Sequence, residues 1–230
     1  MYLFNTQLLT GFKFKKVVKI ISGLNNFNLV NILKVVKAPE LSQASYIDFA
    51  ANTKLVRILR SMTSLPICVS SISPTELYNC VVSGANLVEI GNFDCYYKNN
   101  IFFSGEQLFK LAEETCNLLK DKDICVTLAS ALSLDDQVKL SINLEKIGVN
   151  FLQTEGFANT ANDNFVKNFN YRYILESVSN SFYSLFSTYV VSRFVKVPII
   201  TFSKLDFLSS SIAISFGASV IGIVSNVSQQ

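Results

Sequence analysis

The sequence contains no histidine and no tryptophan among its 230 residues. Without histidine, the chain cannot build a Ser-His-Asp or Cys-His catalytic arrangement, and it cannot bind zinc through imidazole. Any acid–base chemistry must come from Lys, Asp, Glu, Tyr or Cys side chains. The absence of histidine therefore limits the residue types that can form a catalytic site.

Paired cysteines are also missing. The five cysteines are an odd number without a Cys-x-x-Cys spacing, and we recognise no secretory signal. This pattern indicates a reducing compartment rather than a disulfide framework. Cys68 and Cys125 lie within apolar runs, so we expect them to be buried in the core.

Charge is scarce and scattered. Charged residues make up 16% of the chain, and the net charge is only +3. Because nucleic-acid-binding proteins usually carry a clustered basic stripe, no nucleic-acid partner is expected. Half of the residues are hydrophobic and the mean hydropathy is +0.34, which is typical of a sheet that is buried on both faces.

Residues 207–230 carry no charge, which raises the possibility of a membrane anchor. The apolar run is interrupted by Ser209, Ser210, Ser211 and Ser215. It also contains a Gly-Ala-Ser turn that resembles turns elsewhere in the chain. We therefore expect a helix, a turn and a buried strand here, and no membrane span.

A short pattern recurs along the chain. Gly84-Ala85-Asn86-Leu87-Val88-Glu89-Ile90-Gly91 indicates a helix end, a tight turn and a buried strand with one carboxylate in its middle, and weaker copies begin at Gln43, Gly148 and Gly217. Continuous apolar runs alternate with helical patterns eight times, as in parallel strands covered by helices. We expect strands at 17–21, 46–50, 65–69, 87–90, 124–128, 151–154, 197–202 and 220–223. The helices expected between them cover 28–37, 53–60, a segment from 74, 104–119, 134–147, 173–194 and 206–216.

This alternation predicts a single α/β domain over residues 1–230, folded as a (β/α)8 barrel that ends near its eighth strand. A short helix or arm is expected before the first strand. The alternative is a doubly wound open sheet. The absence of Gly-x-Gly-x-x-Gly after the first strand argues against that alternative.

Charged residues in the middle of the strands should point into the barrel, because helices cover the outer face. Alignment of the repeats on their turns gives Asp48, Glu89, Gln153 and Gly222 equivalent positions, and alternate strands contribute to the same interior layer. Gly222 should leave space opposite the other three. Lys19 lies in the middle of the first strand. We therefore expect these side chains to converge.

Lys19, Asp48 and Glu89 are the catalytic candidates. A buried lysine beside carboxylates has an altered pKa and can form a Schiff base with a carbonyl substrate, while the carboxylates move protons. One alternative is an ion cluster with a purely structural role. Another is a Mg²⁺ site formed by Asp48, Glu89 and Glu155.

Ligand contacts are expected at and just past the carboxyl ends of the strands. The candidates are Ser22, Gly23, Ser70, Gly91, Asn92, Gln153, Glu155, Gly156, Ser203, Gly222 and Ser225. Ser203-Lys204 and Ser225-Asn226 follow strands seven and eight, where many barrels bind phosphate. The polar segment 155–170 could close over this end. The partner expected is a small-molecule ligand, and no motif identifies a cofactor, a metal or an oligomeric state.

Four segments together resemble the hypothetical chloroplast open reading frame 23 family of algal plastid genomes and cyanobacteria. They lie at residues 19–27, 65–71, 87–94 and 153–156. The resemblance implies an aldolase-type TIM barrel in the plastid (chloroplast) stroma, without an established activity. It also implies glycine where this chain has Lys204 and Val224, so a phosphate site formed by those loops would depart from the family pattern.

Two functions stay open at this point. The first is an enzyme with lyase or isomerase chemistry on a small metabolite that can be phosphorylated. The second is a non-catalytic ligand-binding or regulatory protein that uses the barrel as a scaffold. The fold alone does not choose between them.

Overall fold

The strands of the protein form one closed parallel barrel. The computed structural model describes residues 3–22, 32, 44–91, 93–156, 172–202 and 205–224. Within these residues each strand pairs with the next along the chain, and β1 also pairs with β8, so a (β/α)8 barrel is confirmed and the open sheet is excluded. The strands are β1 (Val17–Ile21), β2 (Tyr46–Ala50), β3 (Ile67–Ser70), β4 (Leu87–Ile90), β5 (Asp123–Leu128), β6 (Phe151–Thr154), β7 (Ile199–Thr201) and β8 (Val220–Val224).

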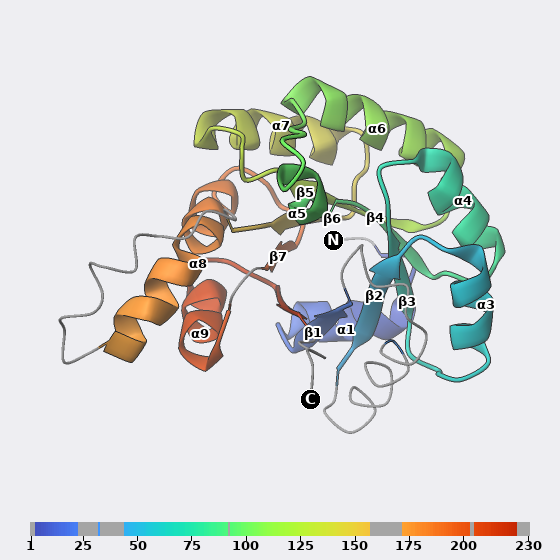
Figure 1. Ribbon diagram of the computed structural model, residues 1–230, viewed down its shortest axis with the longest axis horizontal. Helices are drawn as coiled ribbons and strands as arrows, with labels where there is room; N and C mark the ends of the chain where they lie inside the picture. The colour runs from blue at the N-terminus through green and yellow to red at the C-terminus, as the bar shows by residue number, and fades with distance from the viewer. Residues whose placement is uncertain are drawn as a thin grey trace.

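Helices surround the barrel on its outside (Figure 1). The helices of this outer ring are α3 (Thr53–Arg60), α4 (Pro74–Val82), α6 (Gly105–Leu118), α7 (Leu134–Lys146), α8 (Arg172–Val191) and α9 (Phe207–Ser215). Two other helices, α1 (Thr6–Lys13) and the short α5 (Asp94–Tyr97), are not part of this ring. Polar side chains at Asn52, Ser73, Ser104, Ser133 and Asp206 accept the first free backbone N–H groups of their helices. The sequence did not predict α5. The helix predicted at 28–37 lies outside the described residues, apart from Ile32.

The strands are buried on both faces. Every residue of β2 through β6 is buried. Outward residues such as Ile47, Val88 and Val126 pack under the helices in one large apolar cluster. Inward residues such as Tyr46, Cys68 and Cys125 form a second cluster inside the barrel. Burial on both faces explains why the strands appear in the sequence as continuous apolar runs.

Helix α1 closes the end of the barrel at which the strands begin. Leu8 and Phe12 of α1 belong to the same apolar cluster as the inward residues Tyr46 and Phe151. The rings of Phe12 and Phe151 are stacked, with 4.6 Å between their centroids. The lower half of the barrel interior is therefore a packed apolar core.

Asp123, at the start of β5, attaches the beginning of the chain to this end. Its carboxylate accepts hydrogen bonds from the backbone N–H groups of Phe4 at 2.9 Å and Asn5 at 2.8 Å. Burial raises the pKa of Asp123 despite these donors. The contact fixes where α1 starts relative to the barrel.

Within residues 207–224, the uncharged C-terminal stretch forms α9 and β8, as predicted. Gly217 has a φ of +112°, so it adopts the left-handed conformation of the turn that joins the two elements. Among the described helices, none combines the length and apolar character needed to cross a bilayer.

Substitution of Phe12 by alanine tests the role of α1. We expect Phe12→Ala to lower the free energy of unfolding by about 3–5 kcal/mol, because it removes a buried ring from a packed core. The matched control is Phe14→Ala, since Phe14 is 68% exposed beside the same helix and should change stability by less than about 0.5 kcal/mol. Equal losses in denaturant unfolding of both variants would contradict this assignment.

Candidate functional site

Lys19 is the centre of a polar cluster in the barrel interior. Its side chain is fully buried, and its Nζ lies 2.9 Å from Asp48 Oδ2 and donates a hydrogen bond to Gln153 Oε1 at 2.8 Å. Nζ also donates to the Glu89 carboxylate. The partners come from β2, β4 and β6, so three alternate strands contribute to one level of the interior.

Hydroxyl and amide groups complete the cluster. Ser70 Oγ donates to Asp48 Oδ1 at 2.6 Å, and Thr127 Oγ1 donates to Glu89 Oε1 at 2.9 Å. Gln153 Nε2 donates to the same Glu89 oxygen at 2.9 Å. Thr127 was not among the residues predicted from the sequence. Its position could have indicated this role, because it is a polar residue two positions after Cys125, on the inward face of an otherwise apolar strand.

The charges of the cluster determine its protonation. Burial lowers the pKa of Lys19, but the carboxylates of Asp48 and Glu89 outweigh this effect and hold the pKa well above its ordinary value. Burial raises the pKa of Glu89, and the neighbouring ammonium offsets only part of that increase. Lys19 is therefore an ammonium at neutral pH, and Glu89 has a higher proton affinity than an exposed carboxylate.

Two predicted glycines lie against this cluster. A Cβ added to Gly91 would lie 2.1 Å from Thr127 Oγ1, so the backbone approaches the cluster more closely than any other residue would allow. Gly222 pairs with Lys19 in the barrel register. The space that we expected opposite the carboxylates is partly filled, because a Cβ at Gly222 would already meet Phe202 at 3.2 Å.

Glu155 belongs to a separate set of contacts after the end of β6. Its Oε1 accepts hydrogen bonds from the Tyr97 hydroxyl and from the backbone N–H of Ser130 at 3.0 Å. Burial and the neighbouring Glu155 both raise the pKa of Tyr97, so the phenol stays protonated. Tyr97 comes from the short helix α5, whereas Gly156 follows Glu155 and is also buried.

The potential metal ligands differ from those of the Mg²⁺ site that was considered as an alternative. Among the described residues, ligand atoms of Asp48, Cys68 and Glu89 lie within 4.8 Å of one another, and Glu155 is not part of this group. Lys19 already contacts both carboxylates. Burial also raises the pKa of the Cys68 thiol, which keeps it protonated. The geometry supports a lysine-centred cluster rather than a cation site.

The remaining predicted contacts fall into two sets. Ser22, which follows β1, has a buried Oγ with no hydrogen-bond partner in the described structure. The other predicted positions lie outside the described residues: Gly23, Asn92, Ser203, Lys204, Ser225, Asn226 and most of the segment 155–170.

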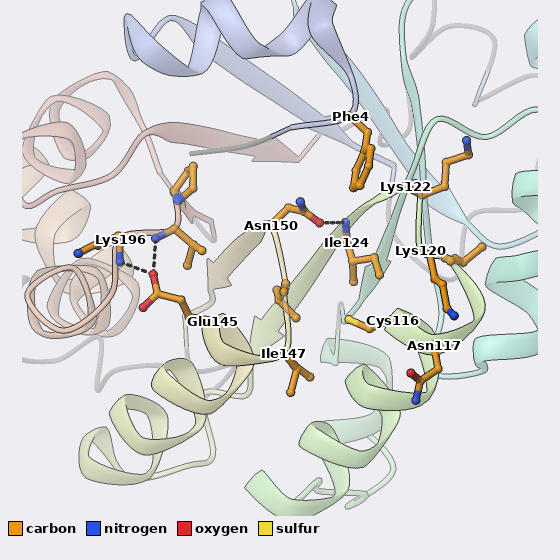
Figure 2. Close-up of a pocket in the computed structure, with 15 residues that line it drawn as sticks. Phe4, Cys116, Asn117, Lys120, Lys122, Ile124, Glu145, Ile147, Asn150 and Lys196 are labelled. Carbon is orange, nitrogen blue, oxygen red and sulfur yellow. Dashed lines mark hydrogen bonds between the residues drawn. The ribbon is translucent and has the colours of Figure 1, made fainter.

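A cleft of about 600 Å³ lies at the opposite end of the barrel, before β5, β6 and β7. Its lining includes Lys120, Lys122 and Lys196, but Figure 2 shows these side chains directed away from one another. Glu145 accepts hydrogen bonds from the backbone N–H groups of Lys196 at 2.7 Å and Val197 at 3.1 Å. Because no charged groups converge there, this cleft is not the candidate site.

The closed parallel barrel is an aldolase-type (β/α)8 fold. The solved structure of QR15, an aldolase, is 15% identical with a TM-score of 0.64, and the match covers 92% of this chain and 90% of that chain. A deoxyribose phosphate aldolase from Aeropyrum pernix is 10% identical with a TM-score of 0.67, and the match covers 96% and 92%. At these identities the likeness establishes the fold alone.

A family model described as "Protein of unknown function (DUF561)" matches residues 3–230, and the chain belongs to this family. The uncharacterized protein ycf23 of Antithamnion sp. is 44% identical over 100% of this chain and 83% of the relative. The ycf23 protein of Cyanophora paradoxa is 37% identical over 98% and 90%. The predicted family is confirmed. Plastid genomes encode these relatives, which supports a plastid location.

Removal of Lys19 tests the electrostatics of the cluster. We expect Lys19→Met to lose about 3–5 kcal/mol of stability at pH 8, because two buried carboxylates lose their cation. The loss should be smaller at pH 5.5, because Glu89, whose pKa burial already raises, then binds a proton in the folded state. Since the folded variant binds more protons than the unfolded chain, its stability falls as the pH rises.

Two further variants control this experiment. Lys19→Met combined with Glu89→Gln should recover part of the loss, because one carboxylate is gone. Lys139→Met removes an exposed pair with Asp136 at 3.8 Å and should change stability by less than about 1 kcal/mol. If Lys19→Met had the same free energy of unfolding in urea at pH 8 as the wild type, Lys19 would not compensate the charge of the carboxylates.

Proposed function

We propose that the protein is an enzyme of lyase or isomerase type that acts on a small carbonyl metabolite, which can carry a phosphate group. The observation that carries this proposal is the buried set of Lys19, Asp48 and Glu89 inside the barrel. Barrel enzymes place their reactive groups at the carboxyl ends of the strands. Two of the structures that share this barrel fold are named as aldolases, and one of these is named as a deoxyribose phosphate aldolase.

The protonation states suggest a role for each group. With its high pKa, Lys19 would act as an ammonium that stabilises negative charge developing on the substrate oxygen. Glu89, with a raised pKa, would transfer a proton at the carbon beside the carbonyl group. Asp48 would hold the ammonium in position at 2.9 Å.

Substrate contacts would extend from the cluster to the carboxyl ends of the strands. The buried hydroxyl of Ser22 is without a partner in the described structure, and buried polar groups ordinarily have one. We assign it to the substrate, together with the other predicted contacts after the strands. Because the cluster is fully buried, this end of the barrel must open to admit a substrate. The proposed place of action is the plastid stroma.

A non-catalytic ligand-binding or regulatory role is the second candidate. It is favoured by one observation: Lys19, Asp48 and Glu89 are fully buried and bind one another. In that case the cluster is structural, and a ligand binds without being converted.

A ligand screen separates the two candidates. We expect one class of phosphorylated carbonyl metabolites to raise the melting temperature, because a ligand at 100 times its Kd stabilises the folded state by about 2.7 kcal/mol. Unphosphorylated analogues and inorganic phosphate are the controls. Turnover of the stabilising compound, lost in Glu89→Gln while binding persists, supports the enzyme. Binding without turnover supports the second candidate, and no stabilisation across a broad panel contradicts both ligand assignments.

Borohydride trapping distinguishes the ammonium role of Lys19 from Schiff-base chemistry. Because a Schiff base forms from a neutral amine, we expect no reduced adduct on Lys19 at pH 7 with the stabilising compound. Mass spectrometry of the peptide that contains Lys19 measures this directly. An adduct that forms in the wild type and is absent in Lys19→Arg would overturn the ammonium role and establish the Schiff base.

A further inference from the structure

An aromatic groove lies on the outer surface of α8 and α9, which pack side by side outside the barrel (Figure 1). We call it the α8–α9 patch. Its volume is about 350 Å³, and its lining is entirely apolar or aromatic: Phe182, Leu185, Phe186, Tyr189, Ile212 and Phe216. Phe182, Phe186 and Tyr189 lie four and three residues apart and therefore share one helix face.

The patch exposes much aromatic surface. Phe182 is 49% exposed, Tyr183 beside it 57%, Phe186 41% and Tyr189 37%. The rings also organise one another, since Phe182 stacks on Phe186 with 5.7 Å between centroids. Large exposed apolar patches on soluble proteins mark sites of interaction.

The patch carries no charge. Residues 181–192 and 207–224 contain no Asp, Glu, Lys or Arg. Arg193 lies at the edge of the patch, with the guanidinium 3.5 Å from the centroid of the Tyr189 ring. An aromatic centre depleted of charge, with polar groups at its edge, is the composition of a protein–protein interface.

We propose that the α8–α9 patch binds the same patch on a second copy of this chain and forms a two-fold symmetric dimer. In such an interface each surface meets its own copy, so a charged patch would repel itself, whereas this neutral patch does not. A whole aromatic side chain has an accessible area of roughly 200 Å². The exposed fractions of Phe182, Tyr183, Phe186 and Tyr189 therefore add up to roughly 350 Å². This is nearly half of the ~800 Å² that each partner contributes to a standard interface.

The dimer would also cover a second hollow. Phe182, Tyr183 and Phe186 form one wall of a hollow of about 310 Å³, whose other side includes Glu155 and Ser130. A copy bound over the patch would close this hollow on the side of α8. The interface would thus adjoin the carboxyl end of the barrel without occupying the interior.

A membrane surface fits the patch less well. Helices that bind membrane interfaces carry lysine and arginine on the polar face beside their apolar residues, and anionic lipids attract these charges. Residues 181–192 and 207–224 contain no lysine or arginine, and Arg193, which contacts the Tyr189 ring at the edge of the patch, is a single cation rather than a basic face. The second copy is therefore the occupant that the composition favours.

Light scattering coupled to size-exclusion chromatography tests the dimer in the full chain. With a Kd of about 10 µM, we expect the mean mass to rise from near 25.6 kDa at about 1 µM protein towards twice that value at about 100 µM. Phe182→Glu and Tyr183→Glu should each need at least a tenfold higher protein concentration to reach the same mean mass. A buried charge in the interface would raise the dissociation constant at least tenfold.

Phe14→Glu is the matched control, because Phe14 is 68% exposed at the end of α1, and it should stay dimeric. Circular dichroism melting shows that the variants fold, and Phe182→Ser and Tyr183→Ser replace any glutamate variant that does not. A wild-type chain that stays monomeric overturns the proposal, as does a dimer that persists in folded variants at both positions. Binding of a monomeric wild type to phosphatidylcholine vesicles would assign the patch to a membrane surface instead.

Discussion

One buried ammonium between two buried carboxylates is the interaction on which the rest of the interior depends. Each of these charges alone would cost several kcal/mol to remove from water. Together they satisfy one another, since Lys19 contacts Asp48, Glu89 and Gln153. Because these partners lie on β2, β4 and β6, the cluster ties three alternate strands to β1 at one level. A slip in the register of β1, β2 or β4 would leave a buried charge uncompensated, and a slip of β6 would remove the amide that accepts a hydrogen bond from Lys19.

The barrel interior is divided by this cluster into two halves of different chemistry. Towards the beginning of the strands, Tyr46 and Phe151 pack against α1 in an apolar core. Towards their ends, Ser70 and Thr127 direct hydroxyl groups at the two carboxylates. The apolar half excludes water from below, which strengthens the electrostatic interactions above it. Under the proposed function, the reaction would take place at the other end, where the strands end, as it does in barrel enzymes.

Much of this arrangement could be predicted from the sequence, for a physical reason. A charge within a strand that is covered by helices has only the interior to face, so Glu89 in an apolar run already indicates its direction. The hydroxyl partners were harder to predict, because a threonine such as Thr127 is common in any strand. The contact of Tyr97 with Glu155 joins residues 58 positions apart through a helix too short to give a periodic pattern. Such contacts depend on the closed fold rather than on local sequence.

The imbalance of the cluster carries the argument from structure to function. Apolar side chains can fill a barrel interior equally well, and they often replace buried ion pairs without loss of stability. Two carboxyl groups around one ammonium leave a surplus negative charge or a bound proton, and the raised pKa of Glu89 follows from burial of that surplus. A carboxyl group that can hold or release a proton beside a fixed cation is what proton transfer next to a carbonyl group requires. Under the proposed function, the second carboxylate is the group that transfers the proton, while the first holds the ammonium in position.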